Sequence, residues 1–339
     1  MKRDSAGRGA GVLILLGTVL PLVVLAAAML GAVPIGFSQW GSVLGNPFGE
    51  SMEASVFWEI RLPRVVMAAL VGGALALAGA GVQGIFRNPL ADPGLIGVSA
   101  GASVGAVACF VAGWQDAAGG WALPLMAFFG GLAAVGLLRA FSAGMESGGA
   151  SKLILAGIAL NAMLGSVLGF ALFSASDSAL RSITFWTLGS CGGANWGQDA
   201  VLVVFLAVGV LLLSRNARAL DALQFGEAQA AHMGIEVRRV RAEVVVACAL
   251  LTGAATAFAG MIGFIGLVAP HMARLLVGGL HRMVLPVSVL IGAVLLVAAD
   301  LGARTLVAPA ELSVGILTAA AGGPFFLWLL RRPSARSLE

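Results

Sequence analysis

Long runs of apolar residues dominate the chain, and short polar segments separate them. A helix needs roughly 20 mostly apolar residues to cross the hydrocarbon core of a bilayer. The runs predict an all-α polytopic membrane protein with about ten transmembrane helices per subunit, and residues 1–339 form one transmembrane domain. The expected spans are 11–32, 62–84, 95–114, 121–139, 152–174, 199–214, 240–260, 264–278, 284–307 and 313–330.

Four stretches depart from this regular pattern. The span at 264–278 is short and contains Pro270, which predicts a broken helix. Residues 182–193 are amphipathic and are expected at the outer surface. Two longer hydrophilic loops are expected at about 33–60 on the outer side and at about 215–239 on the inner side. The inner loop has enough helical character for one or two short helices, and it is either a solvated connector or a docking platform.

Composition supports a membrane protein. Hydrophobic residues make up 59% of the chain and charged residues 11%, whereas a soluble domain carries roughly 25% charged residues. With the N-terminus in the cytoplasm, all but four of the 20 Lys and Arg residues fall on the inner side, as the positive-inside rule requires. Both termini are therefore expected in the cytoplasm. The basic residues flank apolar runs, so the net charge of +4 does not indicate nucleic acid binding.

The sequence predicts a path across the membrane, but it contains no motif that would supply energy for transport. A phosphate-binding loop needs a Lys in a glycine-rich pattern, and Lys2 and Lys152 lie in no such pattern. An ion-coupled carrier places acids deep in the membrane. Asp300 is the candidate, but Arg304 follows one helical turn later and predicts a local ion pair. A separate ATPase is the simplest completion, and no catalytic residue is assigned.

The histidines do not predict a metal site. His232, His271 and His281 are not at ligand spacing with carboxylates. We interpret His271 and His281 as packing or anchoring residues near the cytoplasmic side.

Several motifs then occur in order along the chain. They are Arg61-Leu-Pro-Arg64, Arg87-Asn-Pro-Leu-Ala-Asp-Pro-Gly, Gly263-Phe-Ile-Gly-Leu-Val-Ala-Pro-His271, Ala299-Asp-Leu-Gly-Ala-Arg304 and Glu311-Leu-Ser-Val-Gly. From about residue 55 to residue 332, the chain resembles the permease family of ABC importers for vitamin B12, ferric siderophores and haem. One departure is Ser313, where that family usually has Pro.

The resemblance implies an assembly in the bacterial inner membrane. Two copies of the permease form a homodimer with the translocation path between them. Two cytoplasmic ATPase subunits bind ATP and Mg, and a periplasmic binding protein delivers the substrate. The permease itself binds no cofactor.

The resemblance also assigns the docking of the binding protein. The family's arginines that face acidic residues of the binding protein match Arg61, Arg64 and Arg304. These are three of the four basic residues on the outer side, and complementary charges fix the register of a docking surface. The alternative is that these side chains snorkel or pair with Glu59 or Asp300.

The family's contact with the ATPase has the pattern Leu-Gly-Glu-x-x-Ala-x-x-Leu-Gly. This chain matches it with Phe225 and Met233 in place of the leucines, and a basic residue of the ATPase could pair with the acid. The matching residues are Phe225, Gly226, Glu227, Ala230, Met233 and Gly234. The match favours docking over the connector interpretation of the inner loop.

Residues that close the path in the family match Asn88, Leu90 and Ser151. Asn-Pro also favours a turn by its own chemistry, so a purely structural role is the alternative for Asn88. Arg181 is the fourth outer basic residue. It could attract the propionates of haem, or it could anchor a helix at the interface.

The leading hypothesis is therefore import of an iron complex, with haem preferred, by alternating access. Ferric siderophores and cobalamin are alternative substrates within the same family. Other classes are an ion-coupled secondary transporter and a passive channel. The substrate is selected mainly by the binding protein, so this chain carries little chemistry that identifies it.

Overall fold

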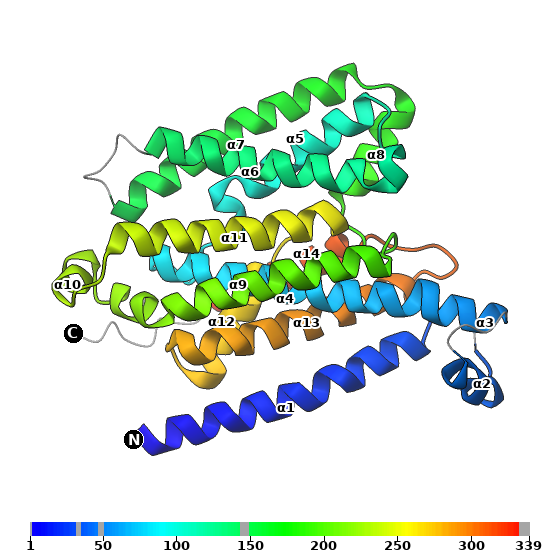
Figure 1. Ribbon diagram of the computed structural model, residues 1–339, viewed down its shortest axis with the longest axis horizontal. Helices are drawn as coiled ribbons and strands as arrows, with labels where there is room; N and C mark the ends of the chain where they lie inside the picture. Colours follow the sequence, from blue (N-terminus) through cyan, green and yellow to red (C-terminus); the bar gives the residue numbers. More distant parts are fainter. Residues whose placement is uncertain (1, 32–34, 47–50, 143–148, 332–339) are drawn as a thin grey trace.

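The structure is a computed structural model that describes residues 2–31, 35–46, 51–142 and 149–331. Over these ranges the chain is helical and forms no strand. The long helices lie roughly side by side (Figure 1). Helix α1 lies at one edge of the bundle, and α5, α6 and α7 lie at the opposite edge.

Within the described ranges, seven helical segments are long and apolar enough to cross a membrane. They belong to α1 (Lys2–Met29), α4 (Leu62–Phe86), α6 (Ala122–Ser142), α7 (Gly149–Ser174), α9 (Trp196–Leu223), α11 (Val237–Ala259) and α13 (His281–Thr305). Three shorter apolar helices are α5 (Val98–Val111), α12 (Ile265–Val277) and α14 (Val314–Arg331). Each of the expected spans overlaps one of these helices, so the all-α fold is confirmed.

The connecting segments carry short helices. The described part of the outer loop contains α2 (Trp40–Gly45) and α3 (Met52–Ser55), and a π-helical segment, Val56–Arg61, joins α3 to α4. The amphipathic stretch lies partly in α8 (Asp177–Thr187). In the inner loop, α9 continues to Leu223 and one short helix, α10 (Glu227–His232), follows.

The expected break at Pro270 is wrong. Helix α12 runs without interruption through this residue, and the irregular backbone falls before it, where Phe264 has φ 68°. A proline inside a helix removes one backbone hydrogen bond. Packing of α12 against α4 and α13 outweighs that loss, so the proline does not end the helix.

Helix α4 forms the centre of the bundle. Every residue from 71 to 86 is buried, as expected for a helix that is apolar on all sides. Small residues let its neighbours approach closely. Gly72 meets Gly292 of α13 and Gly79 meets Gly266 of α12, and neither contact leaves room for a Cβ atom.

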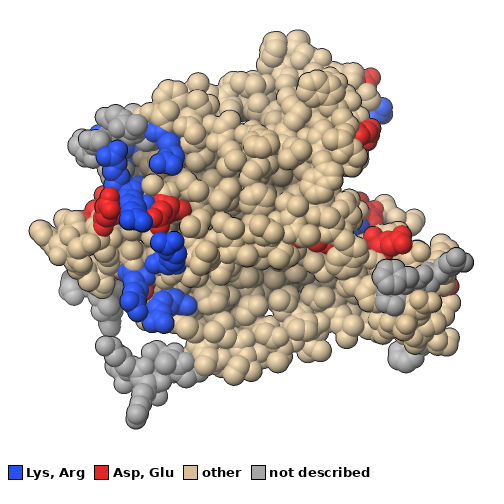
Figure 2. Space-filling model, viewed as in Figure 1, with Lys and Arg blue, Asp and Glu red and all other residues tan. Residues whose placement is uncertain are grey.

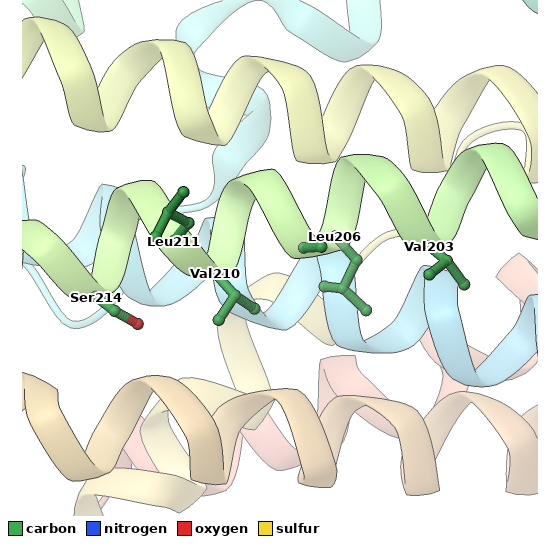
Figure 3. Close-up of a pocket in the computed structure, with 6 residues that line it drawn as sticks. Val203, Leu206, Val210, Leu211 and Ser214 are labelled. Carbon is green, nitrogen blue, oxygen red and sulfur yellow. The ribbon is translucent and has the colours of Figure 1, made fainter.

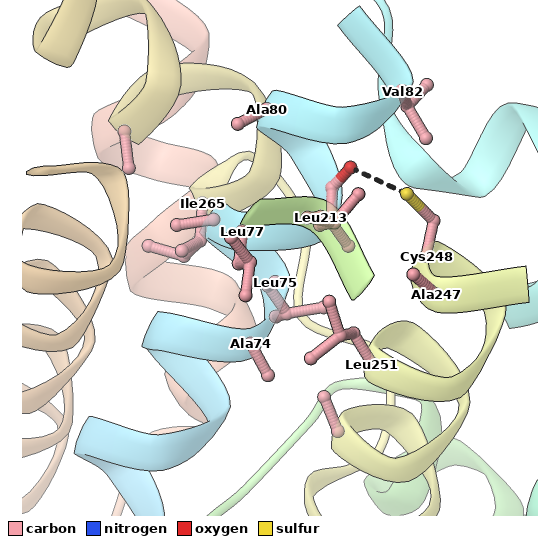
Figure 4. Close-up of a cluster of buried hydrophobic side chains, with 14 of the residues drawn as sticks. Ala74, Leu75, Leu77, Ala80, Val82, Leu213, Ala247, Cys248, Leu251 and Ile265 are labelled. Carbon is pink, nitrogen blue, oxygen red and sulfur yellow. Dashed lines mark hydrogen bonds between the residues drawn. The ribbon is translucent and has the colours of Figure 1, made fainter. Parts of the chain in front are cut away.

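Larger side chains fill the space around α4 (Figure 4). Leu213 of α9, Leu251 of α11 and Ile265 of α12 are all buried there. The Sγ–H of Cys248 on α11 donates to the carbonyl oxygen of Ala78 at 3.3 Å. Helices from distant parts of the sequence are thereby fixed on one central helix.

Glycines also set the contact between α5 and α6. Gly101 and Gly105 lie against Gly130 and Met126, where a Cβ would collide with the backbone. Gly97 has the same four-residue spacing, but it precedes α5 with φ 82°, and its nearest neighbour is Leu160 of α7. Helix packing explains two members of this triad, and the left-handed backbone explains the third.

The segment before α5 lies against α7. Helix α5 has 14 residues, a length of about 21 Å that is less than a bilayer core. The 3₁₀ helix η3 (Pro93–Ile96) precedes it. The side-chain amide of Asn161 on α7 donates to the carbonyl oxygen of Gly94 at 3.0 Å. The same oxygen also accepts from the backbone amide of Gly97 at 3.0 Å, so the bond from Asn161 is a second one that fastens η3 to α7.

We predict that Gly72→Leu separates α4 from α13 and destabilises the protein by about 1–3 kcal/mol or more, because overpacking at a close helix crossing forces backbone shifts. The thermal unfolding midpoint of the purified protein in detergent measures the effect. Gly17→Leu on exposed α1, where nothing lies within 4 Å of the added Cβ, is the control and should melt like the parent. Equal midpoints for the two variants would contradict the packing argument.

Candidate functional site

Charge separates the two ends of the molecule. Lys and Arg side chains gather at the end where α10 lies, and acidic side chains predominate at the other end in this view (Figure 2). Helices α2, α3 and α8 lie at the less basic end. We call the basic end the inner end and the opposite end the outer end, in agreement with the positive-inside rule.

A buried ion network occupies the outer end. It consists of Arg64 on α4, Asp300 and Arg304 on α13, and Glu311 before α14. Arg64 Nε lies 3.0 Å from Asp300 Oδ1, and Arg64 Nη1 lies 2.9 Å from Glu311 Oε2. Arg304 Nε lies 3.1 Å from Asp300 Oδ2. The local pair expected between Asp300 and Arg304 is confirmed, and α4 joins it.

The three arginines expected to dock the binding protein are buried. Arg61, Arg64 and Arg304 are 4%, 6% and 5% exposed. Arg61 donates to the carbonyl oxygen of Met29 at 3.3 Å, and Arg304 donates to that of Ala27 at 2.8 Å, so both also hold the end of α1. For Arg64 and Arg304 the structure therefore contains the pairing with Asp300 that was the alternative interpretation. The docking role of these residues stays a prediction.

The coupling segment, residues 225–234, lies at the inner end. Gly226 has φ 112° and ψ 156°, a region that is essentially open only to glycine. This backbone lets α10 start in a new direction immediately after α9. Ala230 is fully buried, whereas Phe225 and Met233 are 74% and 65% exposed. Two large apolar side chains thus project beyond the membrane-crossing helices at the basic end.

The two remaining residues of this motif have local roles as well. Glu227 pairs with Arg241 of α11, which fixes α10 against the next long helix. Gly234 follows α10 with φ 83°, and the next amide, that of Ile235, donates to the carbonyl oxygen of Ala230. These contacts cap a short helix that could not persist alone. The expected pairing of Glu227 with an ATPase residue stays a prediction.

The turn expected at Asn88 is confirmed. Asn88 Oδ1 accepts from the backbone amide of Leu90 at 2.9 Å, and Asn88 itself is exposed. Arg87, which ends α4, has φ 51°. Its guanidinium lies next to Gly226. The structure therefore brings the turn and the coupling segment together at the inner end.

The other two expected path residues lie at opposite ends. Ser151 belongs to the first turn of α7, and its side chain lies outside the described residues. Arg181 is exposed on α8 at the outer end. The structure does not bring Asn88, Leu90 and Arg181 into one site. A gate role for any of the four stays a prediction.

Sequence reasoning missed Asp199. Asn195 caps α9, since its Oδ1 accepts from the amide of Gln198, so the helix begins earlier than residue 199. Asp199 is 3% exposed, and neither carboxylate oxygen has a hydrogen-bond partner among the residues described. The Asn-x-x-Gln start signal at Asn195 could have revealed that Asp199 lies inside the helix.

A second polar contact joins helices at the inner end. Asp221 of α9 accepts from the backbone amide of His281 at 2.8 Å and contacts its ring Nδ1 at 2.8 Å. His281 is 1% exposed and packs beside Gly84 of α4. This arrangement confirms His281 as a packing and anchoring residue. It ties α4, α9 and α13 together just before the coupling segment.

We predict that Asp300→Asn destabilises the protein by about 3–5 kcal/mol, because it leaves two buried guanidinium groups without their shared carboxylate. Loss of thermal stability in detergent is the measurement. Glu59→Gln removes an exposed carboxylate at the same end and should change stability by less than about 1 kcal/mol. Similar stability of both variants would mean that the network does not hold the outer end together.

Known proteins resemble this chain over nearly its whole length. The profile of the FecCD transport family matches residues 19–332. The hemin transport system permease HmuU of Yersinia pestis is 40% identical, over 94% of this chain and 96% of its own. The vitamin B12 import permease BtuC of Vibrio cholerae is also 40% identical, over 86% of this chain and 88% of its own.

A solved structure has the same fold. An inward-facing conformation of a transporter assigned to the metal-chelate ABC type superposes with a TM-score of 0.85 at 29% identity. The match covers 96% of this chain and all of that one. The profile match and both permease relatives agree with this fold, and the chain belongs to the FecCD transport family.

Proposed function

We propose that this chain is the membrane permease of an ABC importer that carries haem from the periplasm to the cytoplasm. It works as a homodimer in the bacterial inner membrane, with both termini in the cytoplasm. Two ATPase subunits bind at the inner end and a periplasmic binding protein binds at the outer end. ATP and Mg act in the ATPase subunits, and the permease moves by alternating access.

The coupling segment is the observation that carries the ATPase contact. Phe225 and Met233 are large, apolar and exposed, and both lie beyond the membrane-crossing segment Trp196–Leu223 at the basic end. Exposed apolar side chains with a polar surround are typical of a protein interface. A partner that receives them would bury two anchors on either side of α10. Because α10 is tied to α9 and α11, movement of the partner would reach long helices directly.

The outer end supports docking of a different kind. Glu311 is half exposed and already occupies one side of the Arg64 guanidinium. A carboxylate of the binding protein would therefore have to compete with Glu311, because Asp300 is buried beneath. If that carboxylate replaced Glu311, docking of the binding protein would break the contact between Arg64 of α4 and the segment before α14. Arg61 and Arg304 would act through the end of α1.

A second copy of the chain would complete the path. Helix α7 exposes apolar side chains along its length, and Phe170 and Phe173 are 73% and 90% exposed. Lipid or a partner helix could cover this face. The turn at Asn88 and Leu90 and the start of α7 at Ser151 would then close the path at its inner end. The oligomeric state of the purified permease tests the dimer.

Haem is preferred over cobalamin because of Arg181. This exposed arginine lies at the outer end, where haem propionates would meet it, whereas cobalamin presents carboxamides. The two relatives with 40% identity carry names for both substrates, so identity alone does not decide between them. Ferric siderophores stay the third substrate class to be compared.

An ion-coupled carrier is the alternative of another class. Asp300 is neutralised by two arginines, but the buried carboxylate of Asp199 lacks a partner among the described residues. Uptake that persists without the ATPase and stops with an uncoupler would support a carrier. Membership of the FecCD family favours the ABC importer.

We predict that Gly226→Val uncouples ATP hydrolysis from transport, because a β-branched residue cannot hold the φ and ψ of Gly226 without about 1–3 kcal/mol of strain. ATPase activity and substrate uptake are measured together in proteoliposomes that contain the whole importer. Ala228→Ser, which changes an exposed residue of α10, should leave the ratio of hydrolysis to uptake unchanged. Normal coupling in Gly226→Val would place the ATPase contact elsewhere.

We predict that Arg181→Gln lowers haem uptake about fivefold at limiting substrate, as expected for loss of one surface charge contact of about 1 kcal/mol. Haem, a ferric siderophore and cobalamin compete in the same reconstituted importer. Arg181→Lys keeps the charge and should retain most of the haem uptake, and cobalamin uptake should not respond to either variant. An equal fall for all three substrates would remove the assignment to haem.

A further inference from the structure

A shallow groove runs along α9 on the surface of the bundle (Figure 3). It has a volume of about 540 Å³, and its lining is apolar except for one hydroxyl. The lining residues are Val203, Leu206, Ala207, Val210, Leu211 and Ser214. Val203, Leu206, Val210 and Ser214 lie along the side of α9 that faces α13.

The length of the groove fits one leaflet of a bilayer. From residue 203 to residue 214 the helix rises about 16 Å at 1.5 Å per residue. Half of a hydrocarbon core of about 30 Å is about 15 Å. All of the lining residues belong to α9, and Leu206 and Val289 of α13 both lie near Gly73 of α4, so α13 adjoins this part of α9. A single extended acyl chain matches this shape.

Each of the two helices carries an exposed arginine at its inner end. Arg218 is exposed and lies one turn beyond Ser214 on the same face of α9. Arg282 is exposed at the start of α13. The 2.8 Å contact between Asp221 and His281 holds these two helix ends together. Within the described part of the chain, neither arginine forms an ion pair.

We propose that this groove binds an anionic phospholipid of the inner leaflet. One acyl chain lies along Val203 to Leu211, and Arg218 and Arg282 hold the phosphate. The hydroxyl of Ser214 lies between chain and headgroup, at the depth of the lipid's ester oxygens. Basic side chains on the cytoplasmic side of a membrane protein attract anionic headgroups. The proposal needs the inner ends of α9 and α13 to face the cytoplasm, and it is independent of the transported substrate.

The bound lipid also has a structural consequence. It would span the inner ends of α9 and α13 immediately before the coupling segment. A phosphate between Arg218 and Arg282 would relieve the repulsion of two cations on adjoining helix ends. Lipid binding would therefore stabilise the position from which α10 begins.

The test uses the full-length chain, purified in detergent and analysed by native mass spectrometry with added phosphatidylglycerol or phosphatidylcholine of identical acyl chains. We expect one phosphatidylglycerol per chain, bound about tenfold more tightly than phosphatidylcholine. The double variant Arg218→Gln/Arg282→Gln should reduce phosphatidylglycerol binding to the level of phosphatidylcholine. Arg139→Gln, an exposed arginine at the end of α6, is the matched control and should retain the difference.

Two further experiments test the acyl-chain part and the headgroup part of the site separately. Val210→Trp fills the groove and should weaken binding of both lipids, and an unchanged thermal midpoint without lipid shows that this variant is folded. Inorganic phosphate should not displace phosphatidylglycerol. Equal binding of the two lipids by the parent, full retention by the double variant or displacement by phosphate overturns the proposal. A change of oligomeric state in Val210→Trp would assign the groove to a second copy instead, and would overturn it too.

Discussion

The close crossing of α4 with its neighbours determines the rest of the architecture. Residues 71–86 are buried on every side, so lipid contributes nothing to holding this helix in place. Glycine-to-backbone contacts with α12 and α13 replace side-chain interdigitation there. Packing at such short range is specific, because the contact leaves no space for even one additional carbon atom. The bundle is assembled around this helix, and the surrounding helices present apolar side chains to it as well as to lipid.

Polar contacts then fix both ends of the same group of helices. At the outer end, the ion network joins α4 and α13 to the segment before α14 and to the end of α1. At the inner end, His281 and Asp221 join α13 to α9 beside α4. Buried charges without partners are costly, so each end opposes independent movement of its helices. Helices α4 and α13 therefore form a rigid unit that connects the face with Glu311 to the face with α10.

Much of this could be predicted from the sequence, because apolar length and charge asymmetry are properties of short segments. The spans, the turn at Asn88, the pair of Asp300 with Arg304 and the helix in the inner loop follow from local patterns. Burial of Arg64 and Asp199 could not be predicted in this way. A charge count assigns a residue to one side of the membrane, but only the packing of distant helices decides whether water reaches it. The same limit applies to Pro270, whose helix is held by tertiary contacts.

The bond from Asn161 to the carbonyl oxygen of Gly94 restricts how the permease can change shape. Asn161 lies near the middle of α7, and the Gly94 oxygen also accepts from the backbone amide of Gly97 at 3.0 Å. If α7 swung outwards alone, the side-chain amide of Asn161 would lose this acceptor inside the membrane-crossing part of α7, where an unpaired amide is costly. Helix α7 and η3 must therefore move together, and any hinge must lie outside them.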